Sequence, residues 1–367
     1  MTLQGKGFMI WQIARCEGGN ADAIANAAQA AGLTHVLIKI ADGPYPYNKD
    51  KTTGRDLVPP VVQALRSKGI RVWGWHYVYG ANPAGEAQIA VRRVQELGIE
   101  GYVIDAEVEY KQPGMDAAAR RFMSDLRSAL PNFPVALSSF RFPSYHPQLP
   151  WKDFLDKCDF NMPQVYWQAA HNAGAQLRRS VREFQALIPY RPVIPTGPVY
   201  KAGDWAPTPA DVIEFMDTAR ALNLPSANYF EWYYGRTILK PVWDAIAAYS
   251  WPAYPTPPDI TEQYITALNS HDANAVASLY SPQAVHITAT QTVQGTDAIR
   301  NWFANFFSQV LPNATFSLTG SSGTGNSRHF TWEARSSNSA VRNGNDTFGL
   351  LNGKIAYHYS YFTITAT

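Results

Sequence analysis

Two acidic side chains separated by one residue are the clearest chemical signal in this sequence. Asp105 and Glu107 follow the apolar run 102–104, which is typical of a buried strand. Because side chains alternate along a strand, both carboxyls would face the same way, about 7 Å apart. Mutual repulsion and loss of solvent would raise the pKa of one of them, which makes it a candidate general acid near neutral pH. The alternative is a pair of solvated acids held by Lys or Arg at a strand end.

Further side chains near the ends of apolar runs are candidates for binding a substrate: Asp42, His76, Tyr77, Gln164, Tyr166, Glu231 and Trp232. The Gln164 amide and the Tyr166 hydroxyl share one face of the run 160–166 and could hold a sugar amide or a ring oxygen. Glu231 and Trp232 lie on opposite faces of the run 228–233, so only one of them can face inward. For each candidate, a core position or a loop cap is the alternative to a role in a site.

The patterns expected of metal, nucleotide and nucleophile sites are weak. The sequence has no HxxxH or HxH pair, no GxSxG elbow and no GxGxxG after the first strand. Two cysteines, Cys16 and Cys158, cannot complete a structural zinc site, and the sequence leaves open whether they pair. We therefore expect neither a metal nor a cofactor.

Composition excludes several kinds of partner. The chain has 367 residues, a formal net charge of +2 and no basic run, so nucleic acid is not an expected partner. No apolar stretch is long enough to span a membrane. The start, MTLQGKGFMIW, does not resemble a signal peptide. The compartment stays open: extracellular or cell-wall associated if a signal was removed, and cytoplasmic otherwise.

Elements that would position the acids follow from the hydrophobic pattern. Apolar runs that predict strands occur at 8–13, 35–40, 72–79, 102–104, 135–137, 160–166, 193–196 and 228–233. Helical patterns alternate with them at 21–31, 57–68, 83–97, 116–130, 173–188, 209–222 and 242–248. Eight strands alternating with helices over about 250 residues predict a (β/α)8 TIM barrel, whose active site lies at the carboxyl ends of the strands.

A second, smaller domain is expected after a proline-rich linker. The boundaries are 1–249 for the barrel, 250–258 for the linker and 259–367 for the second domain. Helices are predicted at 260–269, 273–279 and 298–309, and strands at 284–290, 315–320, 327–334, 346–351 and 354–363. Asn352-Gly353 predicts a hairpin. This order indicates an α+β domain.

The fourth predicted strand resembles two families of glycoside hydrolases. Glu100-Gly101-Tyr102-Val103-Ile104-Asp105-Ala106-Glu107 is similar to the DGxDxDxE strand of family 18 chitinases and to the D-x-E of family 25 lysozyme-type muramidases. The runs 35–43 and 72–77 are similar in outline to the second and third strands of family 25. Met162, Tyr166 and Trp232 are similar to chitinase residues of the sixth and eighth strands.

That resemblance implies a catalytic assignment and an alternative to it. Glu107 would protonate the glycosidic oxygen, and Asp105 and Tyr166 would hold an N-acetyl group that attacks the anomeric carbon. The implied substrate is an N-acetylated glycan, peptidoglycan or chitin-like. However, Val103 stands where chitinases have their innermost Asp, and the first strand carries no acid. A non-catalytic glycan-binding or scaffold protein is therefore the alternative.

The second part resembles the SnoaL-like branch of the nuclear-transport-factor-like superfamily. The matching segments are 264–272, 279–282 and 294–300. The resemblance implies a cone-shaped α+β domain with an apolar pocket, and a homodimer formed through its sheet. Some members are isomerases or cyclases, so small-molecule binding or isomerase-type chemistry is a further alternative. His286 and His358 could reach the pocket.

Overall fold

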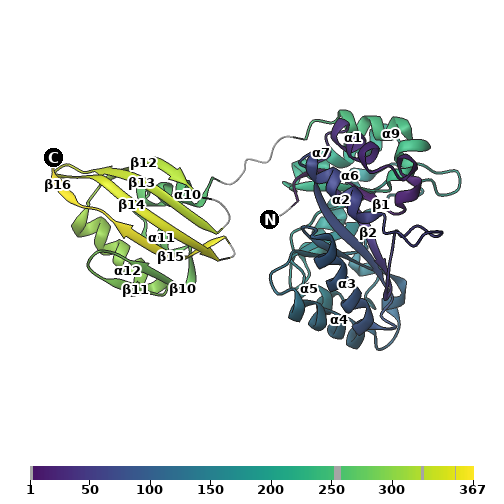
Figure 1. Ribbon diagram of the computed structural model, residues 1–367, viewed down its shortest axis with the longest axis horizontal. Coiled ribbons are helices and arrows are strands. Elements are labelled where there is room, and N and C mark those ends of the chain that lie inside the picture. The colour runs from purple at the N-terminus through teal and green to yellow at the C-terminus, as the bar shows by residue number, and fades with distance from the viewer. Residues whose placement is uncertain (1–2, 252–257, 324–325, 352) are drawn as a thin grey trace. The chain divides into compact units, whose positions relative to one another are not determined.

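The computed structural model describes residues 3–251, 258–323, 326–351 and 353–367. The chain divides into two compact units, Met1–Tyr254 and Pro255–Thr367 (Figure 1). Most of the linker predicted at 250–258 lies outside the described residues. Each unit is described by itself below.

The first unit is a closed parallel barrel. Within residues 3–251 its eight strands are β1 (Gly5–Ile10), β2 (His35–Asp42), β4 (Arg71–Val78), β5 (Tyr102–Ala106), β6 (Val135–Phe140), β7 (Phe160–Gln164), β8 (Thr196–Pro198) and β9 (Ser226–Phe230). Each pairs in parallel with its neighbour, and β1 pairs with both β2 and β9, which closes the sheet. A short strand, β3 (Tyr45–Pro46), extends β2 as a hairpin. The predicted barrel is therefore confirmed.

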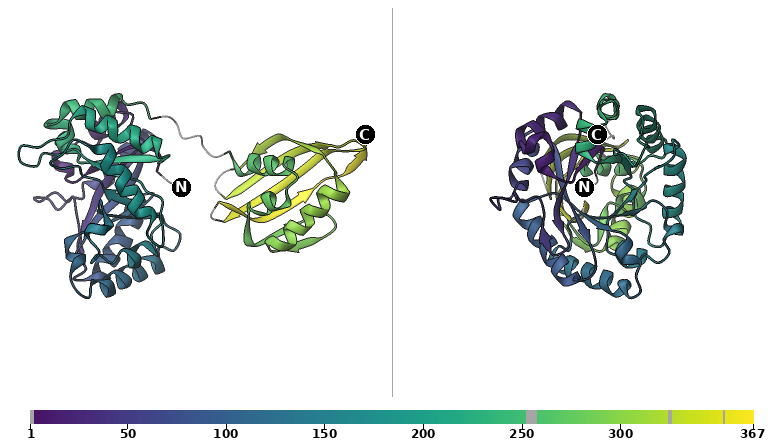
Figure 2. Two further views of the ribbon diagram at one scale, coloured as in Figure 1. Left: turned by 180° about the vertical axis from the view of Figure 1, so that it is seen from behind. Right: turned by 90° about the vertical axis from the view of Figure 1, so that its right-hand side faces the viewer.

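Helices surround the strands, as the ring in Figure 2 shows. They are α1 (Ala21–Ala30), α2 (Val58–Ser67), α3 (Pro83–Leu97), α4 (Met115–Ala129), α5 (Trp151–Leu155), α6 (Ala173–Gln185), α7 (Pro209–Ala221), α8 (Trp232–Thr237) and α9 (Lys240–Ala248). Short 3₁₀ turns occur at Ile13–Arg15, Glu17–Gly19, Val108–Lys111 and Pro143–Tyr145. Helices α5 and α8 were not predicted, because five or six residues are too few to show a helical period.

Local signals explain where the predicted helices begin and end. Helix α3 begins at Pro83, and the Asn82 side chain accepts a hydrogen bond from the Gly85 amide at 3.0 Å. It ends at Leu97, and the next residue, Gly98, caps it with a φ of 59°, in the left-handed region that favours glycine. These capping residues are local in sequence, so the predicted bounds of this helix match the observed ones.

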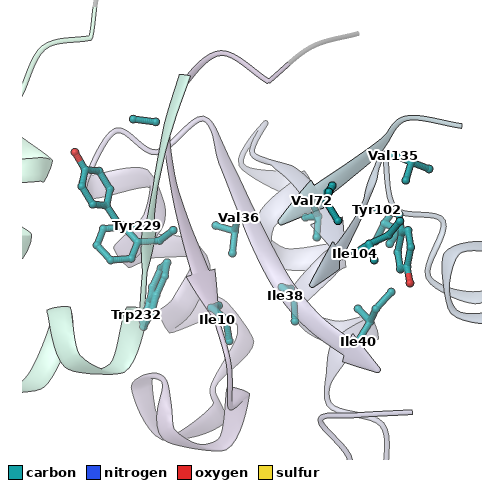
Figure 3. Close-up of a cluster of buried hydrophobic side chains, with 14 of the residues drawn as sticks. Ile10, Val36, Ile38, Ile40, Val72, Tyr102, Ile104, Val135, Tyr229 and Trp232 are labelled. Carbon is teal, nitrogen blue, oxygen red and sulfur yellow. The ribbon is translucent and has the colours of Figure 1, made fainter. Parts of the chain in front are cut away.

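Two separate sets of side chains fill the barrel unit. The outward-facing set packs between strands and helices, and Figure 3 shows part of it, including Ile10, Tyr229 and Trp232. The inward-facing set forms a second cluster inside the barrel, which includes Trp73 and Trp75. Gly101 makes room for the first of these rings, since a Cβ there would lie 2.1 Å from Trp73 Cε2. The tryptophans of β4 therefore fill part of the barrel interior.

The second unit is a curved sheet covered by helices on one face. Its helices are α10 (Ile260–Asn269), α11 (Ala273–Ala277) and α12 (Thr296–Asn305), the last continued by a π-helical turn, Phe306–Val310. Its strands are β10 (Tyr280–Ile287), β11 (Thr292–Gln294), β12 (Thr315–Ser322), β13 (Ser327–Arg335), β14 (Ser339–Leu351), β15 (Lys354–Tyr361) and β16 (Ile364–Ala366). The order across the sheet is β11-β10-β15-β14-β13-β12, with β16 on β14.

The core of this unit lies between the sheet and the helices. Phe330, Trp332 and Phe348 from the strands share one cluster with Tyr264 and Phe303 from the helices. Leu351 and Lys354 pair across the hairpin that was predicted at Asn352-Gly353, where Asn352 is outside the described residues. The expected α+β domain is confirmed, whereas β11 and β16 were too short to be predicted.

Candidate functional site

The two acids predicted to do chemistry lie at the carboxyl end of β5. Asp105 is buried, with 6% of its surface exposed, and Glu107 follows the strand and is half-buried. Strand register places Asp42, Tyr77, Asp105 and Ser138 side by side on four neighbouring strands. The closed barrel thus brings these side chains to one end.

Gln164, the last residue of β7, holds the two acids together. Its Nε2 atom donates to Asp105 Oδ1 at 2.9 Å and to Glu107 Oε1 at 2.8 Å. An amide nitrogen has two hydrogens, so both are used on the acids and only the carbonyl oxygen is left for a substrate. Gln164 is therefore a residue that orients the acid pair.

Burial controls the protonation of the pair. Loss of solvent, followed by the charge of Glu107, holds the pKa of Asp105 well above its usual range. Burial also raises the pKa of Glu107, against the effect of the bond from Gln164. The acids are hydrogen-bonded to each other as well, so they titrate as a unit and retain a proton to higher pH than isolated carboxyls.

The alternative in which the acids are held by basic side chains is not what the structure shows. Within the described residues, neither Asp105 nor Glu107 has a Lys or Arg nitrogen within ion-pairing distance. The positive charge of Lys39 acts on both acids, but Lys39 is itself paired with Asp42 at 2.5 Å. Among the described residues, the acid pair is therefore held by the Gln164 amide and not by a basic side chain.

A hydrogen-bonded rim extends from β2 to the turn after β5. Asp42 accepts from Tyr79 at 2.8 Å as well as from Lys39, and the rings of Tyr77 and Tyr79 lie 4.9 Å apart. Tyr77 donates to Glu109 at 2.8 Å, and burial together with this bond raises the pKa of its hydroxyl. Asp42 and Tyr77 therefore belong to a hydrogen-bonded network at the same end of the barrel as the acid pair.

Three aromatic side chains lie at the carboxyl ends of β7, β8 and β9. Tyr166 lies 5.4 Å from Tyr200 and 6.4 Å from Phe230, measured between ring centroids. Phe230 lies 6.1 Å from Trp75 inside the barrel. Burial raises the pKa of Tyr166, and the charges of Asp105 and Glu107 add to this effect. The Tyr166 hydroxyl therefore stays a neutral donor close to the acid pair.

His76 does not belong to this site, contrary to the sequence-based hypothesis. It is fully buried on the outer face of β4, where one ring nitrogen contacts the Tyr102 hydroxyl and the other the Gly43 carbonyl, both at 2.7 Å. Burial lowers its pKa to about 4. Because side chains alternate along β4, His76 points away from the barrel interior and forms its hydrogen bonds in the layer between strands and helices.

Trp232 and Glu231 are also placed elsewhere. The last strand ends at Phe230, so neither residue lies in it, and Phe230 is the side chain that faces inward. Trp232 begins α8, is fully buried against Trp243, and donates to Glu17 at 2.6 Å. Glu231 is buried and accepts from the Tyr233 amide at 3.2 Å as the cap of α8. Both therefore serve the outer layer and not the site.

Lys39, Glu109, Tyr200 and Phe230 are site residues that the sequence did not indicate as candidates. Lys39 sits inside the run 35–40, where a single charge among apolar residues is unusual and is the one signal that could have identified it. Glu109 follows Glu107 by two residues, but it lies within the 3₁₀ turn Val108–Lys111, so strand alternation does not place it. Tyr200 and Phe230 carry no local signal, because only barrel closure brings them near β5.

The described residues were compared with what a metal site, a disulfide and a membrane span each require. Residues 3–251 and the described parts of 258–367 hold no cluster of three His, Cys, Asp or Glu side chains that could bind an ion. Cys16 and Cys158 are both buried free thiols. In these same segments, none of the helices combines the length and the apolar character that crossing a bilayer requires.

The second unit contains a buried polar chain of its own. Ser360 donates to Asp346 at 2.8 Å, Asp346 pairs with His358 at 2.8 Å, and His358 contacts the Tyr280 hydroxyl at 2.6 Å. His286 stacks on His358 with ring centroids 4.2 Å apart, and burial lowers its pKa to about 2. Hence His286 is neutral.

A cavity of about 260 Å³ opens beside this chain. Its lining is Thr288, Ala289, Thr290, Gln291, Trp302, Asn305, Phe306, Val310, Ser360 and Phe362. Ser360 thus connects the cavity wall to the buried Asp346. Neither of the two expected histidines lines the cavity. His358 is connected to its wall through two hydrogen bonds, and the His286 ring contacts Trp302, which lines the cavity.

Comparison with known proteins identifies the second unit. Residues 261–358 match the SnoaL-like domain. Solved structures similar to it include a proposed ketosteroid isomerase from Kribbella flavida, at 12% identity over 28% of this chain and 75% of that one, with a TM-score of 0.25. A proposed isomerase of the SnoaL-like family from Agrobacterium tumefaciens has 20% identity over 28% and 94%, with a TM-score of 0.25. A proposed polyketide cyclase from Sinorhizobium meliloti has 22% identity over 28% and 94%, with a TM-score of 0.25. No curated protein matches the chain.

The family match thus covers the SnoaL-like domain and leaves the barrel outside it. None of these comparisons supports the resemblance to glycoside hydrolases that the sequence of the fourth predicted strand suggested.

Proposed function

We propose that the barrel is a glycoside hydrolase domain that cleaves an N-acetylated glycan, peptidoglycan or chitin-like. The observation that carries the proposal is the acid pair at the carboxyl end of β5, which Gln164 holds from β7 and which has no permanent counter-ion among the described residues. Active sites of (β/α)8 enzymes occupy this end of the barrel. Tyr166 and the rings beside it supply flat surfaces suited to a sugar.

Each side chain has a defined task in the proposed reaction. Glu107 gives its proton to the glycosidic oxygen, and the bond from that oxygen to the anomeric carbon breaks. The carbonyl oxygen of the substrate's own N-acetyl group attacks the same carbon, while Asp105 accepts a hydrogen bond from the acetamide N–H and Tyr166 donates to the acetamide oxygen. Water then opens the cyclic intermediate, and Glu107 takes the proton back.

The raised pKa of the pair suits this task. A general acid must be protonated near neutral pH, and burial keeps a proton on the Asp105–Glu107 unit. When the acetamide N–H replaces the proton between the acids, Asp105 becomes the acceptor and Glu107 keeps the proton that the glycosidic oxygen needs. Gln164 limits the movement of both carboxyls during this exchange.

The first strand supports the non-catalytic alternative. β1 ends at Ile10 and is followed by Trp11 and Gln12, so no acid stands at its carboxyl end. A barrel that lacks this acid could bind a glycan without cleaving it. Hydrolysis must therefore be measured separately from binding.

The test uses the full chain with colloidal chitin and with purified cell walls. We expect wild-type protein to release reducing ends and Glu107→Gln to lose activity by a factor of 10² or more, as is typical for removal of a general acid. Glu96→Gln, on an exposed helical surface, is the matched control and should keep full activity. Equal release by wild type and Glu107→Gln would reject the catalytic assignment. Binding without release would support the non-catalytic alternative.

We also propose a second function, small-molecule binding by the SnoaL-like domain. The cavity of about 260 Å³ joins apolar walls to the Ser360 hydroxyl and, through it, to the buried Asp346–His358–Tyr280 chain. Such a pocket fits a compact apolar molecule with one polar group. Naphthols and cyclic ketones are suitable probes in a thermal-shift measurement. The midpoint of wild type should rise, and Val310→Trp, which fills the cavity, should remove the rise. No response of wild type to these probes would contradict this function.

A further inference from the structure

Three side chains that carry nitrogen gather around Phe140, the last residue of β6. The His146 ring stacks on Phe140 with ring centroids 3.8 Å apart, and Lys111 Nζ lies 5.5 Å from the centroid of the same ring. Arg141 follows Phe140 and donates from Nη1 to the Tyr166 carbonyl. Burial lowers the pKa of His146, and the positive charges of Lys111 and Arg141 lower it further. Lys111, Arg141 and His146 therefore form one group, the β6 basic cluster.

The two cations of the β6 basic cluster have no ion pair in the described part of the chain. Neither Lys111 nor Arg141 has a carboxylate oxygen within ion-pairing distance there. A guanidinium group has five N–H donors, and the bond to the Tyr166 carbonyl uses one of those of Arg141. Glu183 of α6 pairs with Arg179 at 2.8 Å, so this acid is already engaged. The cluster thus carries two positive charges that no described carboxylate balances.

Arg141 is partly removed from water, and a cation in that position is unfavourable without a counter-charge. Burial is the main cause that lowers the pKa of its guanidinium group. Two other partly buried arginines of the barrel are balanced, since Arg71 pairs with Glu100 at 2.9 Å and Arg236 with Glu17 at 2.6 Å. An anion from outside the chain would supply at Arg141 what these carboxylates supply to their arginines.

The cluster borders the acid pair at the same end of the barrel. Phe140 lies beside Gln164 in the register of β6 and β7, and Gln164 donates to Glu107 at 2.8 Å. Burial raises the pKa of Tyr200 to about 12, and the charges of Arg141 and Glu107 both act on its hydroxyl. Tyr200 is therefore near both groups, and a ligand at the acid pair can place a substituent at the cluster.

We propose that Lys111 and Arg141 form a binding site for an oxyanion, a carboxylate or a phosphate group carried by the molecule that the barrel binds. The fork of guanidinium donors and the point charge of an ammonium group both suit such a group. The site stands on its own residues and does not require the barrel to cleave a glycan. Its consequence for the substrate does rest on the function proposed for the barrel: the cluster favours an N-acetylated glycan with acidic substituents, as in peptidoglycan, over neutral chitin.

The first experiment follows thermal unfolding of the full chain in phosphate, in tartrate and in chloride at equal ionic strength. Phosphate or tartrate should raise the midpoint above its value in chloride, because a ligand that binds only the folded state stabilises it. The more effective anion identifies the group as phosphate or carboxylate. The double variant Lys111→Gln/Arg141→Gln should lose this rise, and Lys111→Gln alone should lose part of it.

The control is Arg121→Gln/Lys152→Gln, which removes the same charge from exposed positions of α4 and α5 and should keep the rise. General stabilisation by salt acts on wild type and on all variants alike, so the difference between the two double variants reports on the site. Far-ultraviolet circular dichroism verifies that each variant is folded. A midpoint that neither anion raises above its value in chloride, or a rise that persists in Lys111→Gln/Arg141→Gln, would overturn the inference.

The second experiment compares kcat/KM for peptidoglycan fragments with kcat/KM for chitin oligosaccharides. Lys111→Gln/Arg141→Gln should lower the preference for peptidoglycan by about tenfold, a typical cost of losing a hydrogen bond to a charged group. Fragments without their peptides show whether the acidic group is on the sugar or on the peptide. An unchanged preference would contradict the consequence for the substrate. Failure of the proposed barrel function is a different result: neither glycan would be cleaved, although the double variant still loses the rise caused by the anion.

Discussion

The amide of Gln164 should control how the stability of the barrel depends on pH. In the folded protein, burial raises the pKa of Asp105 and of Glu107 above their values in an unfolded chain, about 3.9 and 4.3. A raised carboxyl pKa stabilises the folded state below the unfolded pKa, and this stability is lost as pH rises through the folded pKa. We therefore expect the pair to make the wild-type barrel less stable as pH rises above about 4.

Gln164→Met removes both hydrogen bonds while nearly keeping the side-chain volume. Each bond is worth about 1.5–3 kcal/mol when its carboxyl is ionised and about 0.5–1.5 kcal/mol when it is neutral. Because Glu107 is partly exposed to solvent, we discount its share and expect the loss of stability to grow by about 2 kcal/mol between low and high pH. A free-energy change of about 1.4 kcal/mol corresponds to one pH unit, so the titration of the pair should move upward by about one unit.

Urea unfolding from pH 4.5 to 9, followed by tryptophan fluorescence, provides the measurement. Most of the 11 tryptophans lie in the barrel unit, so the signal reports chiefly on it. Gln185→Met, at an exposed position of α6, is the control and should change little at any pH. A destabilisation by Gln164→Met that is the same at every pH, or that is largest at low pH, would refute the assignment of these bonds to ionised carboxyls.

Three further predictions concern the frame of the barrel. Lys6 donates to the Ile246 and Tyr249 carbonyls, and burial lowers its pKa to about 8. The free energy of unfolding should therefore rise between pH 8 and about 10.4. In urea unfolding, Lys6→Met should abolish that rise and lower the free energy of unfolding by about 1–3 kcal/mol at pH 7. The pKa of His76 is lowered to about 4, so the stability of the barrel should fall as pH drops from about 6.5 toward 4. In thermal unfolding, His76→Gln should reduce that fall. An unchanged dependence on pH would contradict the assignment of the fall to His76. Gly101→Ala should lower the unfolding free energy by about 1–3 kcal/mol through its clash with Trp73, and no loss would contradict the tight packing.

Much of the architecture was predictable because its signals are local. Apolar runs alternating with helical patterns gave eight strands, and caps such as Asn82 and Gly98 set helix ends. The spacing of Asp105 and Glu107 on a strand end also required no distant residue. These features depend on neighbours within a few positions along the chain, where backbone geometry and hydrophobic period apply directly.

The roles of individual side chains depended on contacts that the sequence does not contain. Whether Glu231 and Trp232 face inward was decided by where the last strand ends, since a new helix begins at Trp232 and turns both residues outward. The sequence predicts Gln164 as a ligand for a sugar, but the closed barrel places its amide between two acids at the end of another strand.

By itself, the sequence determined which segments form the barrel and the α+β domain, and it placed two acids at a strand end. Only the tertiary structure decided which partners those acids have, because strand register and closure bring together residues 59 positions apart, as for Gln164 and Asp105. Hydrophobic period is a property of a segment, whereas the pKa of a buried carboxyl is a property of everything that surrounds it.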